Sequence, residues 1–365
     1  MAYNILVINP GATSTKIGWF EDDKEIFTTN IMHSAQELDA IPTKKEKIEY
    51  RSEMVKKTLN EQGFDMSTLS AIACRGGTFG GLLGGAYIVD DFMVDVCLKP
   101  NQGHPANYAA VIGKEIADEL GIKAYIYDGV GTNETDPIAR MTGIKGIQRL
   151  NRTHALNTRA VCKAAARDLG MKYADGTFIA VHMGGGVSIN IQSGGRIVDT
   201  IATDEGPMST TRCGIIPGNT IVKMMQGKIT NVATGEPFTV KEINELMGSK
   251  GGLVSLLGTN DVIEVEQRYF AGEQEVIDVV KFWAYQIAKY VGLMATVRCG
   301  KIDQIILTGG PAKSKMFTDL IRERIEWIAP VKVIGGALEM EALAEGILAV
   351  LNGEEEANVL TEAFD

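Results

Sequence analysis

The sequence has few cysteines, no excess of positive charge and no long apolar run. Its five cysteines are odd in number and far apart, and none forms a Cys-x-x-Cys pair, which argues against a disulfide framework and a cysteine metal site. A formal net charge of −10 argues against a surface for nucleic acid or anionic membranes, because such a surface is basic. No stretch approaches the length of a membrane span, and no basic segment precedes the first apolar run. We therefore expect a cytoplasmic protein that binds neither membrane nor nucleic acid.

An apolar run over residues 5–8 enters a turn that is followed by three hydroxyl side chains and one lysine. This pattern predicts a β-hairpin whose loop exposes backbone N–H groups, hydroxyls and an ammonium to a phosphate. It is not a Walker A loop, because the second glycine before the lysine is missing and an apolar strand follows. Alone, the same residues could form an ordinary turn. The candidate phosphate-binding residues are Asn9, Gly11, Thr13, Ser14, Thr15 and Lys16.

A second copy of this hairpin occupies residues 178–191. Gly184 aligns there with Gly11, Ser188 aligns with Thr15, and the glycines that should approach phosphate are Gly184, Gly185 and Gly186. In both halves of the 365-residue chain a helix, a strand ending in Gly-Gly, another helix and a further strand come after the hairpin. Such a repeat predicts two duplicated α/β domains with mixed sheets and helices on both faces.

The remaining pattern is mainly helical. Helical spacing is found at 46–62, 105–120, 155–169, 275–298, 315–327 and 339–351, and residues 215–300 form a mainly helical insert. The loop 76–85 contains six glycines, so it is either mobile or closely approached by another group. The acidic residues 354–356 are expected to form a solvated end.

Two α/β domains that each have a phosphate-type hairpin suggest a nucleotide held in the cleft between them. The motifs then resemble, in order from the first strand to the last helix, the butyrate kinase branch of the acetate kinase family, within the sugar kinase, Hsp70 and actin superfamily. The motifs that resemble the family are residues 9–16, 75–77, 124–128, 154–157, 182–186, 205–207, 212–214, 256–261, 284–288 and 307–310.

The resemblance implies two RNase H-like domains, 1–152 with 340–365 and 153–339, around an interdomain nucleotide cleft. It implies reversible transfer of the ATP γ-phosphoryl group to a short-chain carboxylate, butyrate or a branched relative, giving an acyl phosphate and ADP. It also implies Mg²⁺ and a homodimer or higher homo-oligomer. Because a carboxylate is already ionised at pH 7, the reaction needs no general base.

The resemblance assigns the catalytic roles to Asp128, Arg75, Arg212, His154 and His182. Asp128 and Glu339 are the candidate magnesium ligands, although Asp128 could be a turn residue and Glu339 a carboxylate that stabilises a helix N-terminus. Either arginine could be a solvated loop residue, and both are expected on loops. His182 could be a core histidine.

Further candidates surround these residues. Gly309, Gly310 and Ala312 are expected near the adenosine, and His104 near the acyl substrate. Leu82, Leu83 and Val130 could form the wall of the acyl pocket or could be ordinary packing.

The sequence departs from the family pattern at Ala12, where serine is usual, and within 104–107 and 129–134. The last two changes leave the acyl preference open between straight and branched acids. Two other functions compete with a carboxylate kinase: an ATP-binding chaperone or regulatory switch of the same superfamily, and a sugar kinase that uses Asp128 as a base.

Overall fold

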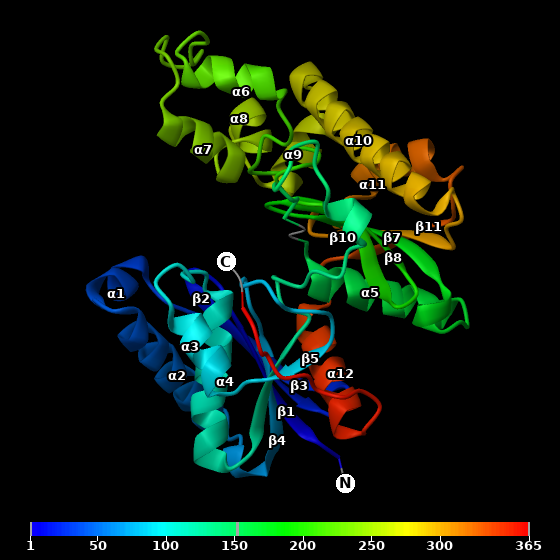
Figure 1. Ribbon diagram of the computed structural model, residues 1–365. Coiled ribbons are helices and arrows are strands. Elements are labelled where there is room, and N and C mark those ends of the chain that lie inside the picture. The colour runs from blue at the N-terminus through cyan, green and yellow to red at the C-terminus, as the bar shows by residue number, and fades with distance from the viewer. Residues whose placement is uncertain (1, 151–152, 364–365) are drawn as a thin grey trace. The chain divides into compact units, whose positions relative to one another are not determined.

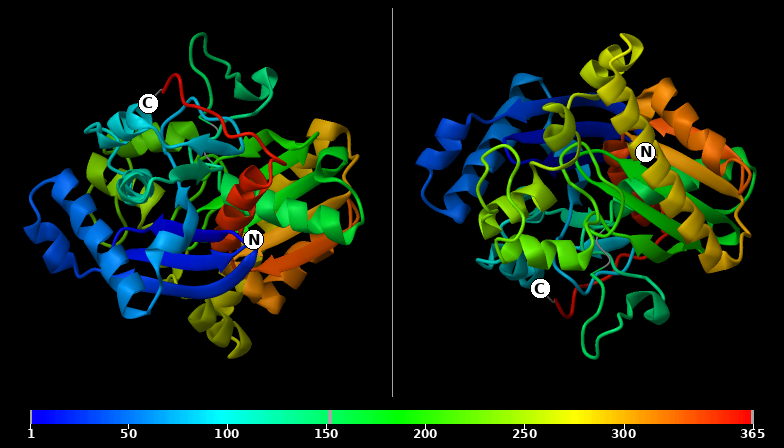
Figure 2. Two further views of the ribbon diagram at one scale, coloured as in Figure 1. Left: turned by 90° about the horizontal axis from the view of Figure 1, so that it is seen from below. Right: turned by 90° about the horizontal axis from the view of Figure 1, so that it is seen from above.

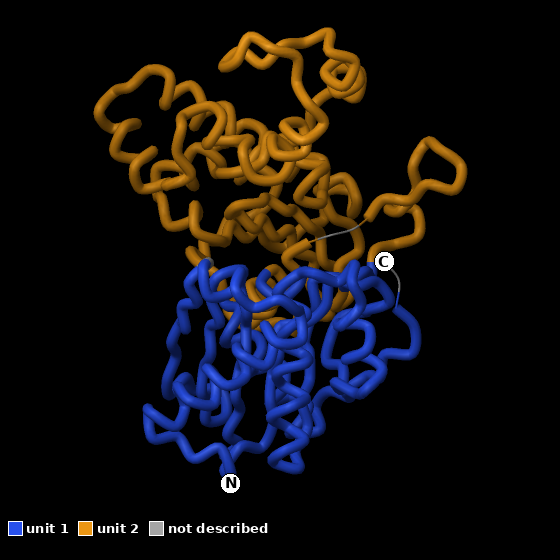
Figure 3. The backbone as a smooth tube through the Cα atoms, turned by 90° about the vertical axis from the view of Figure 1, so that its left-hand side faces the viewer, with its two compact units in different colours: residues 1–134, 155–157, 338–365 blue, residues 135–154, 158–337 orange. Residues whose placement is uncertain are grey.

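The computed structural model of the chain describes residues 2–150 and 153–363 (Figure 1). Its contacts divide the chain into two units, coloured separately in Figure 3. Unit 1 comprises residues 1–134, 155–157 and 338–365, and unit 2 comprises residues 135–154 and 158–337. The predicted domains differ from these units mainly in assigning residues 135–152 to the first domain.

The helices and strands of each unit have the following bounds. Unit 1 contains β1 (Asn4–Pro10), β2 (Ser14–Glu21), β3 (Lys24–Met32), β4 (Leu69–Arg75), β5 (Ala86–Ile88), β6 (Lys123–Tyr127), α1 (Ala35–Ala40), α2 (Lys44–Glu61), α3 (Asp91–Leu98), α4 (Ala106–Leu120) and α12 (Glu339–Leu351). Unit 2 contains β7 (Thr177–Met183), β8 (Val187–Ser193), β9 (Arg196–Ile201), β10 (Gln304–Gly309), β11 (Val331–Gly335), α6 (Gly218–Met225), α7 (Val240–Gly248), α8 (Gly252–Leu257), α9 (Val262–Phe270), α10 (Gln274–Ala295) and α11 (Lys315–Ile325). Helix α5 (Ala155–Asp168) is divided between the two units.

The two sheets have the same topology. The order β3-β2-β1-β4-β6 of the first sheet corresponds strand for strand to β9-β8-β7-β10-β11 of the second. In each sheet the opening hairpin is antiparallel, and its first strand pairs in parallel with the fourth. Strand β5 is an addition at the edge of the first sheet. The predicted duplicated α/β fold, with mixed sheets flanked by helices, is therefore confirmed.

The hairpin pairing corrects one detail of the predicted repeat. Pro10 pairs with Thr15, whereas Met183 pairs with Val187, so the first loop is one residue longer than the second. The next pairs outward are Asn9 with Lys16 and His182 with Ser188. The alignment of Thr15 with Ser188 is wrong by one residue, and the counterpart of Ser188 is Lys16.

The first sheet has two faces of different character. Alternate residues such as Leu6, Ile8 and Ile72 pack with α2, α3 and α4 in one core, and α12 contacts the opposite face at β1, β4 and β6 (Figure 1). Gly18 on β2 permits this approach, because a Cβ there would lie 3.0 Å from Met340 Cε. Side chains at the next positions along β1, β2 and β4 therefore point toward α12.

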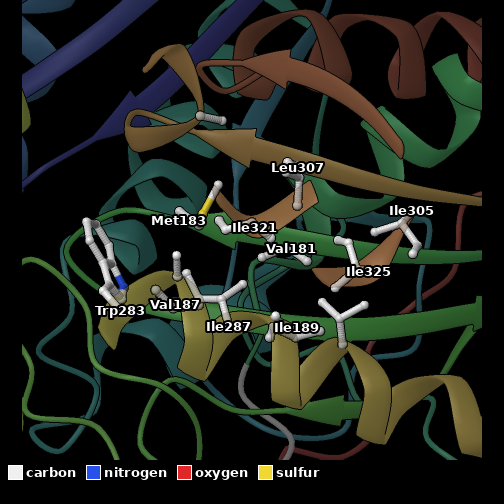
Figure 4. Close-up of a cluster of buried hydrophobic side chains, with 14 of the residues drawn as sticks. Val181, Met183, Val187, Ile189, Trp283, Ile287, Ile305, Leu307, Ile321 and Ile325 are labelled. Atoms are coloured by element: carbon white, nitrogen blue, oxygen red, sulfur yellow. The ribbon is translucent and has the colours of Figure 1, made fainter. Parts of the chain in front are cut away.

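The second core lies between the sheet of unit 2 and two of its helices. Helices α10 and α11 contact each other (Figure 2), and the rings of Trp283 and Phe317 lie 4.2 Å apart between their centroids. Side chains of β7, β8 and β10, among them Val181, Ile189 and Leu307, complete this core (Figure 4). The predicted helical insert at 215–300 is confirmed as α6 to α10.

The C-terminal segment forms part of unit 1, and the prediction that 354–356 form a solvated end is wrong for Glu355. Its carboxylate accepts hydrogen bonds from the Ala86 N–H at 3.1 Å and the Tyr127 hydroxyl at 2.9 Å. A Cβ on Gly81 would lie 2.4 Å from the Glu362 carbonyl oxygen. The glycines of the loop 76–85 thus permit close approach of this segment. Across residues 2–150 and 153–363, no helix has the length and apolar character that a membrane crossing requires.

Candidate active site

Unit 1 contains an open cavity of about 660 Å³ at the ends of β1 and β4. Seven of the predicted site residues line it: Asn9, Gly11, Ser14, Lys16, Arg75, His104 and Glu339. The residues that complete the lining are Pro10, Ala12, Asn30 and Pro105. Asn30 was missed by the sequence analysis, although it is the strand partner of Lys16.

Strand register explains why these residues meet. Asn9 and Lys16 are paired across the first hairpin, and Ile8 pairs in parallel with Cys74, which precedes Arg75. All three polar side chains therefore lie on the sheet face that α12 covers. Glu339 is the first residue of α12, so the helix brings a carboxylate to this edge of the sheet. Arg75 ends strand β4, which corrects its predicted place on a loop.

The cavity holds more positive than negative charge. Glu339 forms an ion pair with Arg75, and its carboxylate accepts a hydrogen bond from Asn9 Nδ2 at 2.9 Å. Lys16 adds a second cation to the lining. Burial and the nearby Arg75 charge lower the pKa of His104, whose Nδ1 accepts a hydrogen bond from the Ala106 N–H. The cavity therefore suits an anion, with a neutral imidazole beside it.

The structure corrects the prediction that the first hairpin exposes all three of its hydroxyl groups. The Thr15 side chain is completely buried and lies between Arg51 and His33, at 3.0 Å and 2.9 Å from Thr15 Oγ1. Arg51 donates to the Thr15 hydroxyl, and that hydroxyl shares a second hydrogen bond with His33 Nε2. Thr13 is exposed but does not line the cavity. Within this loop the Gly11 N–H donates to the Ser14 carbonyl at 2.8 Å.

His33 gives unit 1 a pH-dependent stability. Burial, reinforced by the charge of Arg51 and opposed by Glu37, lowers the pKa of His33 to about 4. The unfolded chain binds this proton near pH 6.5 and the folded chain only near pH 4, so stability present at neutral pH is lost as the pH falls between these values. We expect the loss to reach about 3 kcal/mol, since each pKa unit corresponds to about 1.4 kcal/mol.

Replacing His33 tests this expectation. The variant His33→Gln has no group that titrates at this position, so the decline of its unfolding free energy from pH 7 to pH 4.5 should be smaller than that of the wild type by about 2–3 kcal/mol. Chemical denaturation of both proteins at the two pH values measures the difference. Equal declines would show that His33 does not carry the effect.

In unit 2 two predicted histidines lie together. The rings of His154 and His182 stack with their centroids 3.8 Å apart. His154 Nδ1 lies 2.8 Å from the hydroxyl of Ser188, which is the strand partner of His182. Ser188 therefore fixes the orientation of the His154 ring. In the sequence Ser188 stands out only as a position of the repeat.

The second hairpin and Arg212 also lie side by side. A Cβ on Gly186 would be 3.5 Å from Arg212 Cζ, and Arg212 Nη1 donates to Thr203 Oγ1 at 2.5 Å. The hydroxyls of Ser209 and Thr211 donate to the Gly185 carbonyl at 2.7 and 2.8 Å. The loop 209–212 thus holds the glycine turn from one side. Its run of hydroxyl residues before Arg212 is visible in the sequence.

The predicted adenosine residues adjoin this hairpin. Gly309 has a φ of +95°, and a Cβ there would lie 1.9 Å from the Met183 carbonyl oxygen, so only glycine fits. Gly310 follows directly and precedes the short helix η5 (Pro311–Lys313). Ala312 is 3% exposed and packs in the core of unit 2. Gly309 is buried and pairs with Gly336 through both its N–H and its carbonyl, so Gly310 is the exposed residue of the three.

Asp128 is not among the residues that line the cavity, although it directly follows Tyr127, the strand partner of Arg75. Its φ is +42°, its side chain is 3% exposed, and its Oδ1 accepts a hydrogen bond from the Gly85 N–H at 2.9 Å. The three acyl-pocket candidates do not line the cavity either. Leu82 is buried in the core of unit 1, Leu83 is 59% exposed, and Val130 donates its N–H to the Gly76 carbonyl.

Comparison with known proteins identifies the family. The model of the acetokinase family matches residues 140–346. A relative from Clostridium botulinum (strain Alaska E43 / Type E3), named a probable butyrate kinase, is 40% identical over 362 residues, which are 98% of this chain and 100% of the relative.

Solved structures share the fold. The acetate kinase of Porphyromonas gingivalis superposes with a TM-score of 0.77 at 18% identity, over 96% of this chain and 100% of that one. A propionate kinase from Francisella tularensis subsp. tularensis SCHU S4 superposes with a TM-score of 0.74 at 17% identity, over 94% of this chain and 98% of that one. The chain belongs to the acetokinase family, and it is an enzyme of the carboxylate kinase class.

Proposed function

We propose that this carboxylate kinase phosphorylates a four-carbon acid, butyrate or a branched relative, with ATP as the donor, and that the reaction is reversible. The cavity of unit 1 is the observation that supports the anionic substrates, because Lys16 and Arg75 face a single carboxylate there. The near full-length relative named a probable butyrate kinase supports the acid.

In the proposed mechanism the protein positions the acid and ATP and neutralises the charge of the transferring phosphoryl group. The acid is ionised at pH 7 and attacks the γ-phosphorus without a base, so the protein has only to align the two anions and stabilise the transferring group. In our proposal Arg75 and Lys16 bind one anion in unit 1, while Arg212 stabilises charge on the transferring phosphoryl group. His154 and His182 donate hydrogen bonds to phosphate oxygens, and Gly184, Gly185 and Gly186 approach the nucleotide phosphates.

The residues near Glu339 fit a magnesium ion held mainly by the nucleotide. Magnesium sites in such enzymes use one or two carboxylates together with phosphate oxygens and water. Within residues 2–150 and 153–363 no group of three histidine, cysteine or acidic side chains could hold a metal alone. Glu339 and Asp128 stay the proposed carboxylates, and bound Mg²⁺ would neutralise charge on the phosphoryl oxygens.

We also propose a homodimer or higher homo-oligomer in the cytoplasm. Helix α10 supports the assembly, because Phe282, Tyr285 and Leu293 are each more than two-fifths exposed on it. The free cysteines of the structure support a reducing compartment. The nucleotide cleft between the predicted domains stays a prediction. The family assignment disfavours the chaperone and sugar kinase alternatives.

Acid preference tests the proposed substrate. A fitted pocket gains contact from two methylenes that acetate lacks, which together are worth about 1.6 kcal/mol by transfer and about 3 kcal/mol in a fitted site. We expect butyrate or isobutyrate to exceed acetate by roughly ten-fold to a few hundred-fold in kcat/KM. The measurement compares acetate, propionate, butyrate and isobutyrate under one set of conditions. If acetate equals or exceeds the four-carbon acids, the proposed acid is wrong and only the reaction class remains.

A further inference from the structure

We propose that Arg51 of α2 positions the first hairpin for anion binding, a role that rests on the proposed carboxylate kinase function. The guanidinium is 1% exposed and donates to four oxygens of one loop. Nη1 donates to the carbonyls of Gly11 at 3.1 Å and Ser14 at 2.8 Å and to Thr15 Oγ1 at 3.0 Å. Nη2 donates to the Ala12 carbonyl at 2.7 Å. One side chain thus fixes every residue of the loop except Thr13.

The environment of Arg51 argues that its role is more than general stability. None of the ion pairs between described residues includes Arg51. The ring of Tyr108 lies over the guanidinium, with its centroid 5.7 Å from Arg51 Cζ. A buried charge without a counter-ion is costly, and here burial lowers the pKa of the guanidinium. The buried guanidinium holds the loop in one conformation.

That conformation directs the loop toward the cavity. In a trans peptide the carbonyl and the following N–H point in opposite directions. Since the carbonyls of Gly11 and Ala12 point to Arg51, the N–H groups of Ala12 and Thr13 point away from it. Gly11, Ala12 and Ser14 line the cavity. Arg51 therefore orients the positive ends of two peptide dipoles, as anion-binding loops do.

The sequence contains a recognisable sign of this role. On α2 the buried positions are Ile48, Arg51, Ser52, Val55 and Leu59, so an arginine occupies the apolar stripe of an otherwise amphipathic helix. A solvated arginine would lie on the opposite face. A charge in the stripe indicates a buried partner elsewhere in the fold, and here the partner is the hairpin.

The test compares Arg51→Met and Arg51→Lys with a matched control, Arg159→Met. Arg159 of α5 is 5% exposed and donates from Nη1 to the Gly195 carbonyl at 3.0 Å, in a turn of unit 2 outside the predicted site. For each protein we would measure kcat, the KM values of ATP and the acid, and Tm with and without inorganic phosphate at matched ionic strength. The phosphate-induced change in Tm needs no turnover, since a ligand that binds the folded state raises Tm by mass action.

We expect Arg51→Met to lower kcat/KM by about 10- to 100-fold, the effect of misplacing a binding group by about an ångström. The KM of ATP or of the acid should rise, since the misplaced loop binds its anion less well. Loss of folded protein alone would lower kcat and leave both KM values unchanged. Its phosphate-induced rise in Tm should be smaller than that of Arg159→Met. Arg51→Lys should recover part of the loss, because an ammonium reaches fewer of the four oxygens than a guanidinium fork.

The outcomes separate the two proposals. If the wild type lacks carboxylate kinase activity but Arg51→Met loses its response to phosphate, only the proposed function fails. If a folded Arg51→Met stays within two-fold of the wild type in KM and in phosphate response, the role of Arg51 is wrong. If Arg51→Met does not fold, Arg51→Lys provides the test. A KM and a phosphate response in Arg51→Lys equal to those of the wild type would also show that the role of Arg51 is wrong.

Discussion

The variant Asp128→Asn is expected to lose turnover, by about 10³-fold in kcat or more, while it still binds ATP. Asparagine keeps the oxygen that accepts the Gly85 N–H, and it tolerates the left-handed backbone that Asp128 adopts. The change therefore removes a charge and leaves the local fold in place. In the proposed mechanism that charge would help to hold Mg²⁺. Calorimetric titration with ATP would establish that the nucleotide site is intact.

Asp22 provides a matched control for this change. It also has a left-handed backbone, with a φ of +55°, and its Oδ1 accepts the Tyr3 N–H at 2.8 Å in the turn after β2. Asp22→Asn repeats the chemical change outside the proposed site, so its kcat should stay within two-fold of the wild type. Near-normal turnover of Asp128→Asn would move the magnesium role to Glu339 alone.

The second large effect is expected for the two arginines. Arg75→Ala and Arg212→Ala should each lower kcat/KM by roughly 10²-fold or more, the size of a lost preorganised charge partner. Removal of Arg75 also removes the ion pair that it forms with Glu339. Removal of Arg212 leaves the glycine turn in place, since Ser209 and Thr211 hold the Gly185 carbonyl. Steady-state kinetics of each variant measures the loss.

A control separates catalysis from the loss of an ion pair. Lys56→Ala removes the contacts of Lys56 with Glu115 and Glu119 in unit 1, outside the cavity. We expect this variant to keep wild-type kcat/KM, because exposed ion pairs contribute only about 0–1 kcal/mol. An arginine variant with the kinetics of Lys56→Ala would have to be removed from the proposed site.

Most of the fold could be predicted from the sequence because its patterns are local and repeated. The hairpins, the strands that end in Gly-Gly and the last helix show in periodicity and glycine placement, and the two sheets have the predicted repeat. The misplaced equivalence of Thr15 and Ser188 depended on loop length, which glycine and hydroxyl residues do not specify. Glu355 looked solvated because its partners, Ala86 and Tyr127, are more than 200 residues away.

Most residues that line the cavity were predicted from the sequence, but their contacts were not. The family resemblance named Asn9, Lys16 and Arg75 as site residues, but Arg75 was expected on a loop, and its meeting with Glu339 required α12 to pack on that face of the sheet. Arg51 was missed because it lies in the buried stripe of α2, and His33 because its burial and its contact with Thr15 appear only in the fold. Their function depends on a hairpin that is distant in sequence from Arg51, and only packing reveals it.

Transfer of a phosphoryl group from ATP to a short-chain carboxylate can be tested directly by trapping its product. Purified protein would be incubated with ATP, Mg²⁺, hydroxylamine and butyrate or isobutyrate, and any acyl phosphate would be trapped as the hydroxamate. We expect hydroxamate and ADP in equal amounts with the four-carbon acids, and no hydroxamate when glucose replaces the acid. Two results would rule out a carboxylate kinase: ADP that forms with the acids while no hydroxamate appears, or ADP that forms only when glucose is present.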